Sequence, residues 1–344
     1  MNIYRTHLIV TRKDAEIIKH LSFPNHSLIL KEEPSLCFWE SSDGGVFSQL
    51  VNGYDKGHIG NDDKPQLELI IKAESDENAE DLLEIIHGGM LLAYPEPDLT
   101  TNFTFISEIN DEFEIMYREE PFRNYFKRFE NIRFGCEIAS EAINDNTIIY
   151  AIEKYKISLE LSSFAPHSAN PKYGQVFNNY NVQHQNHTRY AFAIISAFSV
   201  IEELELEIRS SSKKHRFTNN DEGIWNEEVY EDIVKRLEQV GIANDSTFDW
   251  IYRGTPTRIE NDIKPLFGYD SKWTDYGEDI RDKTLTFPQA IHNASYLRNF
   301  IAAHKFNELT QFVSPYDVFN IQCLARQLIL NKIGFWNKML SRNK

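Results

Sequence analysis

Apolar and polar residues follow two different patterns along the chain, and the change between them falls near residue 143. Before that point, residues 67–71 alternate between apolar and polar, as a half-buried strand does. Residues 76–92 then carry apolar side chains three and four positions apart, which predicts a helix. We expect Gly88-Gly89 to weaken or break this helix, because glycine is a poor helix former.

The rest of the first part completes a mixed α/β pattern. Residues 102–117 alternate again, like an edge or surface strand, and the Gly- and Asp-rich residues 52–65 are typical of a loop. No group of residues here has the composition of a catalytic site. We therefore expect a mixed α/β domain over residues 1–143, with an accessory or regulatory role.

The second part of the chain has the apolar spacing of long helices packed on one another. A first helix is marked by Ile148, Ile152, Tyr155 and Leu159. A longer helix carries a stricter seam, formed by Tyr190, Ile194, Ala197, Ile201, Leu204 and Ile208.

Three further features complete this part. A third helix is predicted over residues 226–240, and a long insert follows at about 242–286. A fourth helix begins near Pro288, and a fifth begins at Pro315 and continues toward Gly334. We therefore expect residues 144–344 to form an all-α bundle, so that the whole chain is of the α+β class.

Composition limits the protein's environment. No apolar run is long enough to span a bilayer, and the start of the chain lacks the apolar run of a secretory signal. Cys37, Cys136 and Cys323 are far apart and odd in number, which favours reduced thiols and no metal site. We expect a cytoplasmic protein without membrane contacts.

The formal net charge of −16 constrains any RNA substrate, because the field of a strongly acidic protein repels phosphates. Basic groups must then be gathered locally, or supplied by a partner. One candidate cluster follows the second predicted helix: Arg209, Lys213, Lys214 and Arg216. It can be a patch that docks phosphates or simply a solvated loop.

The end of the fourth predicted helix carries Arg298, Asn299 and, after four more residues, His304. This segment resembles the motif of the HEPN superfamily, whose nuclease members are small helical bundles with an arginine, a polar residue and a histidine in this order. The surrounding helices are similar too, with a long helix that ends near Glu202-Glu203. The resemblance covers roughly residues 144–334 and does not reach the first domain.

A second pair, Arg209 and His215, has the same spacing. It lies where the second predicted helix gives way to a Ser- and Lys-rich loop, and a serine follows the arginine. We interpret it as a chance match, because no apolar scaffold fixes its geometry.

The resemblance implies a ribonuclease in which the 2′-hydroxyl of RNA attacks the adjacent phosphate, with neither metal nor cofactor. The residue types suit this chemistry, because imidazole transfers protons near neutral pH and guanidinium donates to two phosphate oxygens. Asn299 could orient either group. Six residues of a regular helix turn a side chain by about 600°, so Arg298 and His304 lie roughly 120° apart. A local kink or a second protomer must bring them together, and the resemblance implies a homodimer with facing motifs.

Each motif residue also has a structural interpretation. His304 falls in the apolar stripe of its helix and could be a satisfied core histidine. Arg298 could pair with Glu202 or Glu203 of the neighbouring helix, and the same pair would support catalysis by positioning the arginine.

Aromatic residues of the insert raise a similar choice. Trp250, Trp273 and Tyr276 could stack on unpaired bases, with Arg253 beside them as a further RNA contact. They could equally pin the insert to the body of the protein.

These observations lead to an endoribonuclease of the toxin or abortive-infection type, acting in phage defence. The first domain would bind an antitoxin or sense a trigger. Phe306 stands where some HEPN toxins carry a tyrosine that a nucleotidyltransferase modifies, so we do not expect that control. The alternative is a catalytically silent helical module that binds a protein or nucleotide partner.

Overall fold

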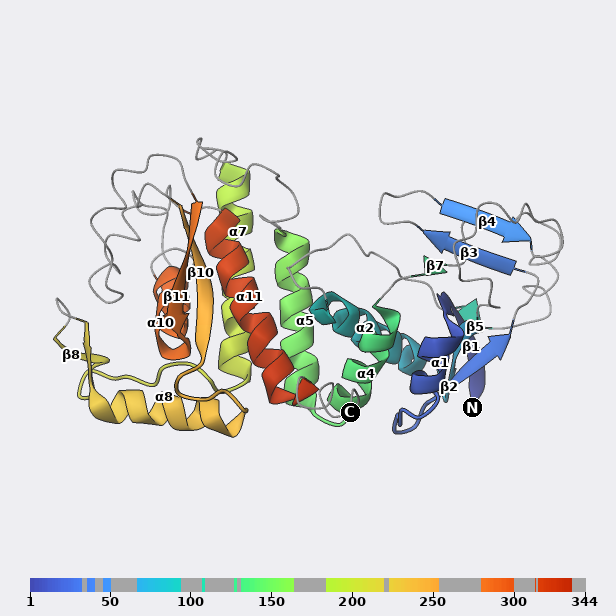
Figure 1. The fold of residues 1–344 in the computed structure, drawn as a ribbon, viewed down its shortest axis with the longest axis horizontal. Coiled ribbons are helices and arrows are strands. Elements are labelled where there is room, and N and C mark those ends of the chain that lie inside the picture. Colours follow the sequence, from blue (N-terminus) through green and yellow to red (C-terminus); the bar gives the residue numbers. More distant parts are fainter. Residues whose placement is uncertain are drawn as a thin grey trace. The chain divides into compact units, whose positions relative to one another are not determined.

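The chain folds into two compact units, made of Met1–Tyr94 with Thr100–Ile149 and of Pro95–Leu99 with Tyr150–Lys344. The computed structural model describes residues 1–32, 36–40, 46–50, 67–93, 107–108, 127–128, 131–163, 184–219, 223–253, 280–299, 313 and 315–335. Helices and strands occur in both units, so the chain is of the α+β class (Figure 1). Of the helices in the described ranges, none has the length and apolarity to cross a membrane.

The first unit contains a sheet that is antiparallel except where β7 pairs with β1, and its strand β5 lies between β2 and β1. The predicted strand at residues 67–71 is confirmed, but it is not half-buried. All residues of β5 except Lys72 are buried, because β5 is an inner strand and contacts a helix. The strands are β1 (Asn2–Val10), β2 (Ser27–Glu32), β5 (Leu67–Ala73), β6 (Ser107–Glu108) and β7 (Lys127–Arg128), with a separate hairpin of β3 (Leu36–Glu40) and β4 (Val46–Leu50).

The helix predicted at residues 76–92 is confirmed as α2 (Asp76–Ala93). The break expected at Gly88-Gly89 is wrong, since α2 runs through it. A Cβ atom at Gly89 would lie 2.8 Å from the carbonyl oxygen of Gly135 on α4 (Ile132–Ala142). Because neither Gly89 nor Gly135 has a side chain, α2 and α4 can pack closely, and this packing offsets the low helix propensity of glycine. The described part of this unit also contains the helix α1 (Arg12–Ile18).

Two predictions for the first unit fall wholly or largely outside the described residues. These are the loop at 52–65 and the strand at 102–117, of which the structure describes only β6.

Three long helices form the core of the second unit: α5 (Asn146–Leu161), α7 (His184–Glu203) and α11 (Pro315–Lys332). They confirm three of the predicted helices, and the apolar stripe expected on α5 is buried. Small polar side chains join them. The Ser158 hydroxyl donates to the Ala193 carbonyl oxygen at 2.8 Å, and the Gln322 amide donates to the Ser162 carbonyl oxygen at 2.7 Å.

The second helix ends earlier than its apolar seam predicts. The seam runs to Ile208, whereas α7 stops at Glu203. Glu205 is in the left-handed region with φ 57°, and the Leu206 N–H donates back to the Ile201 carbonyl oxygen at 2.9 Å. This is the hydrogen-bond pattern of a helix C-cap. Ile208 is buried, but it belongs to the segment after the helix and not to the helix itself.

The expectation of an all-α second part is wrong, because the insert contains a β-ribbon. Strand β10 (Thr247–Arg253) pairs antiparallel with β11 (Ile280–Thr286). The Asn320 side chain of α11 accepts from the Ile251 N–H at 2.8 Å and donates to the Ile251 carbonyl oxygen at 2.9 Å, which ties the ribbon to the helices. A shorter pair, β8 (Phe217–Asn219) and β9 (Ile224–Trp225), precedes the insert.

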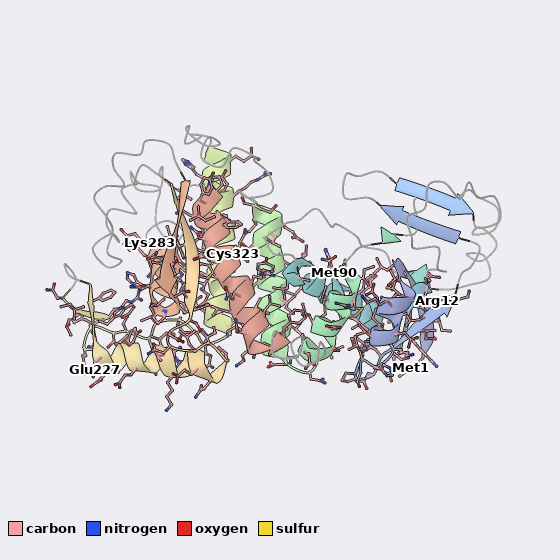
Figure 2. The ribbon with its side chains drawn as sticks, in the orientation of Figure 1. Met1, Arg12, Met90, Glu227, Lys283 and Cys323 are labelled. Atoms are coloured by element: carbon pink, nitrogen blue, oxygen red, sulfur yellow. The ribbon has the colours of Figure 1, made fainter. Side chains whose placement is uncertain are left out.

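The helix α10 (Phe287–Leu297) lies beside this ribbon and also contacts α7, α11 and α8 (Figure 1). It begins with a capping box: the Thr286 hydroxyl accepts from the Gln289 N–H, and the Gln289 side chain accepts from the Thr286 N–H at 2.9 Å. The third predicted helix is confirmed as α8 (Glu227–Gln239), closed by Gly241 with φ 80°. Figure 2 shows how side chains fill the space between the ribbon, where Lys283 is labelled, and α11, where Cys323 is labelled.

Candidate functional site

The arginine of the HEPN-like motif lies at the end of α10. Leu297 is the last α-helical residue, and the backbone turns π-helical at Arg298 and Asn299. A π-helical turn is wider than an α-helical one, and such turns are frequent at functional sites. At these two residues the backbone therefore departs from the regular α-helix on which the separation of about 120° between Arg298 and His304 was calculated. His304 and Phe306 lie outside the described residues, so their placement stays a prediction.

Arg298 is held by side chains from two helices. Its Nη2 atom lies 3.6 Å from Glu202 Oε1, and its Nη1 donates to Asn299 Oδ1 at 2.9 Å. Its Cζ atom lies 5.8 Å from the ring centroid of Phe198, one turn before Glu202 on α7. The side chain remains 37% exposed, so the guanidinium is oriented by protein groups and still open to a ligand.

Of the two glutamates expected to support Arg298, the structure pairs only Glu202 with it. The Glu203 carboxylate lies 2.5 Å from the Lys154 ammonium of α5 instead. These two neighbouring carboxylates therefore point to different partners.

A second arginine reaches the same helix. Arg216 Nη1 lies 2.7 Å from His292 Nδ1, and its Nη2 donates to Ser295 Oγ at 3.3 Å. Asn299 Nδ2 also approaches Ser295 Oγ, at 3.5 Å. His292 and Ser295 on α10 and Asn299 in the π-helical turn after it thus form a row of polar side chains, here called the α10 polar line. Arg216 contacts the first two of these residues, and Arg298 contacts the last.

The protonation of this row follows from its geometry. A guanidinium has only donors, so His292 Nδ1 must accept, and the proton of the neutral ring is on Nε2. Burial, followed by the charge of Arg216, lowers the pKa of His292 to about 3. Burial lowers the pKa of Arg216 to about 10. At neutral pH, Arg216 is therefore charged and His292 is neutral.

Sequence analysis missed His292 and Ser295 as members of the site. Their signal is the spacing of three and four residues from His292 to Ser295 and from Ser295 to Asn299, which puts the three polar side chains on one helix face. Both residues are buried, at 7% and 5% exposure, so they hold other groups in place and do not bind at the surface.

Two of the four residues of the predicted basic cluster form ion pairs with neighbouring carboxylates. Arg209 donates to Glu205 at 3.1 Å and to Glu207 at 3.0 Å, and Lys214 lies 3.1 Å from Glu228. The chance pair Arg209 and His215 lies on the segment between α7 and β8, outside any helix.

Lys213 is exposed, and among the described residues no ion pair is found for it, so its contact with RNA stays a prediction. Arg216 differs from the other three cationic residues because it points to α10.

The aromatic contact expected from the insert is not available at Trp250. Its side chain is 2% exposed and packs in the core, with its ring centroid 6.2 Å from that of Phe248. Stacking on a base is therefore wrong for Trp250, and its role is to pin the ribbon. For Arg253 the structure describes only the backbone, at the end of β10, while Trp273 and Tyr276 lie outside the described residues.

Comparisons with known proteins supply no family for this chain. Family models, curated proteins and solved structures were all searched, and none matches. Within the described part of the chain, no three His, Cys, Asp or Glu side chains lie close enough together to hold a metal ion.

Proposed function

We propose that this protein is a metal-independent endoribonuclease of the HEPN type, with Arg298, Asn299 and His304 at its catalytic centre. The observation that carries the proposal is the state of Arg298. Its guanidinium contacts Glu202, Asn299 and Phe198, and its side chain remains 37% exposed. A cation placed and oriented in this way suits a phosphodiester whose negative charge increases during reaction.

In the proposed reaction, the 2′-oxygen forms a bond to the adjacent phosphorus as the bond from phosphorus to the 5′-oxygen breaks. His304 takes the proton from the 2′-hydroxyl, a proton is delivered to the leaving 5′-oxygen by His304 of the same or the second copy, and Arg298 stabilises the phosphoryl oxygens. The products are a 2′,3′-cyclic phosphate and a 5′-hydroxyl. Asn299 acts as a positioning residue, since its side-chain oxygen accepts from Arg298.

The remaining parts of the proposal concern assembly and biology. The second unit would be a HEPN-like bundle that carries the β10–β11 ribbon as its insert. Two copies would place their motifs in one cleft, since a single helix separates arginine from histidine by six positions. A ribonuclease that damages its own cell must be restrained, and the first unit is the candidate for binding an antitoxin or a trigger. Toxin activity in phage defence is the biological role that fits this arrangement.

Substitution of the two motif residues tests the proposal. Arg298→Ala and His304→Ala should each reduce cleavage of an end-labelled RNA by roughly a hundredfold or more. Arg189→Ala is the matched control, because Arg189 is an exposed arginine on α7 outside the motif. Circular dichroism and thermal melting establish that each variant folds. Equal cleavage by the wild type and both motif variants contradicts the enzyme, and absence of cleavage by all of them favours the binding module.

Mixing the two inactive variants tests the shared cleft. If each cleft takes its arginine and histidine from two chains, subunit exchange between Arg298→Ala and His304→Ala proteins restores part of the activity. A fully active monomer in sedimentation analysis contradicts this arrangement.

A further inference from the structure

The positive charge of Arg216 is not paired with a carboxylate in the way that the charges of Arg209 and Arg298 are. Arg209 pairs with Glu205 and Glu207, and Arg298 pairs with Glu202. The partners of Arg216 among the described residues are an imidazole nitrogen and a hydroxyl oxygen, and no described carboxylate forms an ion pair with it. Its positive charge is therefore oriented but not neutralised.

Such an arrangement is costly for the fold alone. Arg216 is partly removed from water, and burial lowers its pKa, which shows that the surroundings disfavour the charge. A guanidinium has five N–H donors. The described contacts use two of them, and Arg216 is not fully buried, so N–H donors remain for a ligand. An anion bound there would provide the missing counter-charge.

The groups that hold Arg216 are themselves fixed. The His292 ring lies 5.0 Å from the ring of Phe217 and 6.1 Å from that of Trp225, in edge-on contacts. Ser295 is buried on α10 one turn after His292. Because both acceptors are neutral and buried, they set the direction of the guanidinium without removing its charge, as a preorganised anion site requires.

We propose that Arg216, oriented by His292 and Ser295, binds the RNA phosphate next to the one that is cleaved at Arg298. This inference rests on the proposed function. Ser295 contacts Arg216, and Asn299 contacts Arg298. Ser295 Oγ lies 3.5 Å from Asn299 Nδ2, so two side chains in contact link the two cations. An RNA backbone that follows the α10 polar line meets both. Two local cations of this kind also let an acidic chain hold RNA.

The salt dependence of RNA binding tests this subsite. The probe is a fluorescein-labelled oligoribonucleotide with 2′-O-methyl groups, which cannot be cleaved by 2′-hydroxyl attack. Arg216→Gln should weaken binding roughly tenfold near 0.1 M salt. It should also reduce the slope of log K against log salt concentration by about 0.7, the value for one phosphate contact on a single strand.

Two further variants separate this role from general effects. Arg189→Gln removes the same charge from an exposed position on α7 and should leave the slope as in the wild type. Arg216→Lys keeps the charge but loses the planar pair of donors, so the slope should be retained while affinity falls several-fold. If Arg216→Gln fails to fold in a thermal melt, the Lys variant still decides, because unchanged affinity overturns the subsite.

The outcomes also distinguish this inference from the nuclease. An unchanged slope in folded Arg216→Gln overturns the subsite, as does a wild type that does not bind the probe. A reduced slope in a protein that cleaves no RNA supports the phosphate site and contradicts only the nuclease. Cleavage that depends on Arg298, with an unchanged slope in Arg216→Gln, supports the nuclease and overturns only the phosphate subsite.

Discussion

The helices α2 and α10 are both buried along most of their length, but their buried faces have different contents. In α2 these are mainly aliphatic residues, with a single buried histidine, His87, and a glycine pair that brings α4 close. In α10 they include His292, Asn293 and Ser295. An apolar interior stabilises a fold without specifying chemistry, whereas buried polar groups need partners and fix the direction of those partners. This difference supports our proposal that the functional site lies at α10.

The largest expected effect comes from the α2–α4 contact. A Cβ atom at Gly135 would lie 2.4 Å from Met90 Cγ and 2.7 Å from the Ile86 carbonyl oxygen, so Gly135→Ala should lower the free energy of unfolding of the first unit by about 3 kcal/mol. Hydrogen exchange of α2 and α4 amides measures this loss.

The matched control for that substitution is Gly241→Ala. No atom lies within 4 Å of its added Cβ, but φ is 80°, so only backbone strain of about 1 kcal/mol is expected. If Gly135→Ala and Gly241→Ala lowered the free energy of unfolding equally, the close packing of α2 on α4 would not require a glycine at position 135.

The second effect belongs to α10 and depends on pH. The pKa of His292 is lowered from 6.5 to about 3 in the fold, so the unfolded chain binds this proton first as pH falls. The contribution of neutral His292 to the free energy of unfolding is fully present above about pH 6.5 and is lost progressively as the pH falls toward 3. Between pH 7.5 and pH 5, the wild type should lose about 2 kcal/mol more than His292→Gln in denaturant titrations of the second unit.

A neutral glutamine still offers Arg216 an acceptor, so it is the suitable comparison for His292. Parallel pH profiles of the two proteins would show that His292 titrates normally, contrary to its burial. Gly135→Ala, at the α2–α4 contact, should leave this pH difference unchanged.

A third prediction concerns what the two helices share. Both begin at a hydroxyl cap: Ser75 Oγ accepts from the Asn78 N–H at 3.2 Å, and Thr286 Oγ accepts from the Gln289 N–H at 3.4 Å. Ser75→Ala and Thr286→Ala should each cost about 1 kcal/mol of unfolding free energy, because each removes one capping bond. Chemical denaturation checks both values, and a loss above roughly 2 kcal/mol at only one cap would contradict their equivalence.

The smallest effect on stability is expected at Glu202. Glu202 and Arg298 are 42% and 37% exposed, so Glu202→Gln should change the unfolding free energy by less than about 1 kcal/mol. RNA cleavage should nevertheless fall about tenfold, because Arg298 loses its orientation. Glu203→Gln, which breaks the pair with Lys154, is the control and should retain cleavage. A similar loss in both variants would indicate a general effect on α7.

Apolar periodicity was sufficient to predict most helices. The stripes on α5, α8 and α10 are buried as expected, because a helix in a small core must turn one apolar face inward. The pairing of Arg298 with Glu202 was also predictable from the helix order.

Periodicity failed where tertiary contacts decide. The seam through Ile208 continues past the end of α7, because buried residues after a C-cap can keep helical spacing by chance. The ribbon partners Trp250 and Lys283 are far apart in sequence, so no local pattern shows their pairing. His292 was missed for the same reason, since its importance comes from Arg216, which belongs to another segment.

The most direct test of the central claim is incubation of the purified wild-type protein with end-labelled RNA in excess chelator, followed by analysis of the product ends. The account predicts cleavage without divalent ions, giving 2′,3′-cyclic phosphate and 5′-hydroxyl ends, and loss of both products in Arg298→Ala. Intact RNA that is cut only after a divalent ion is restored, or cuts that leave 3′-hydroxyl ends, would contradict it.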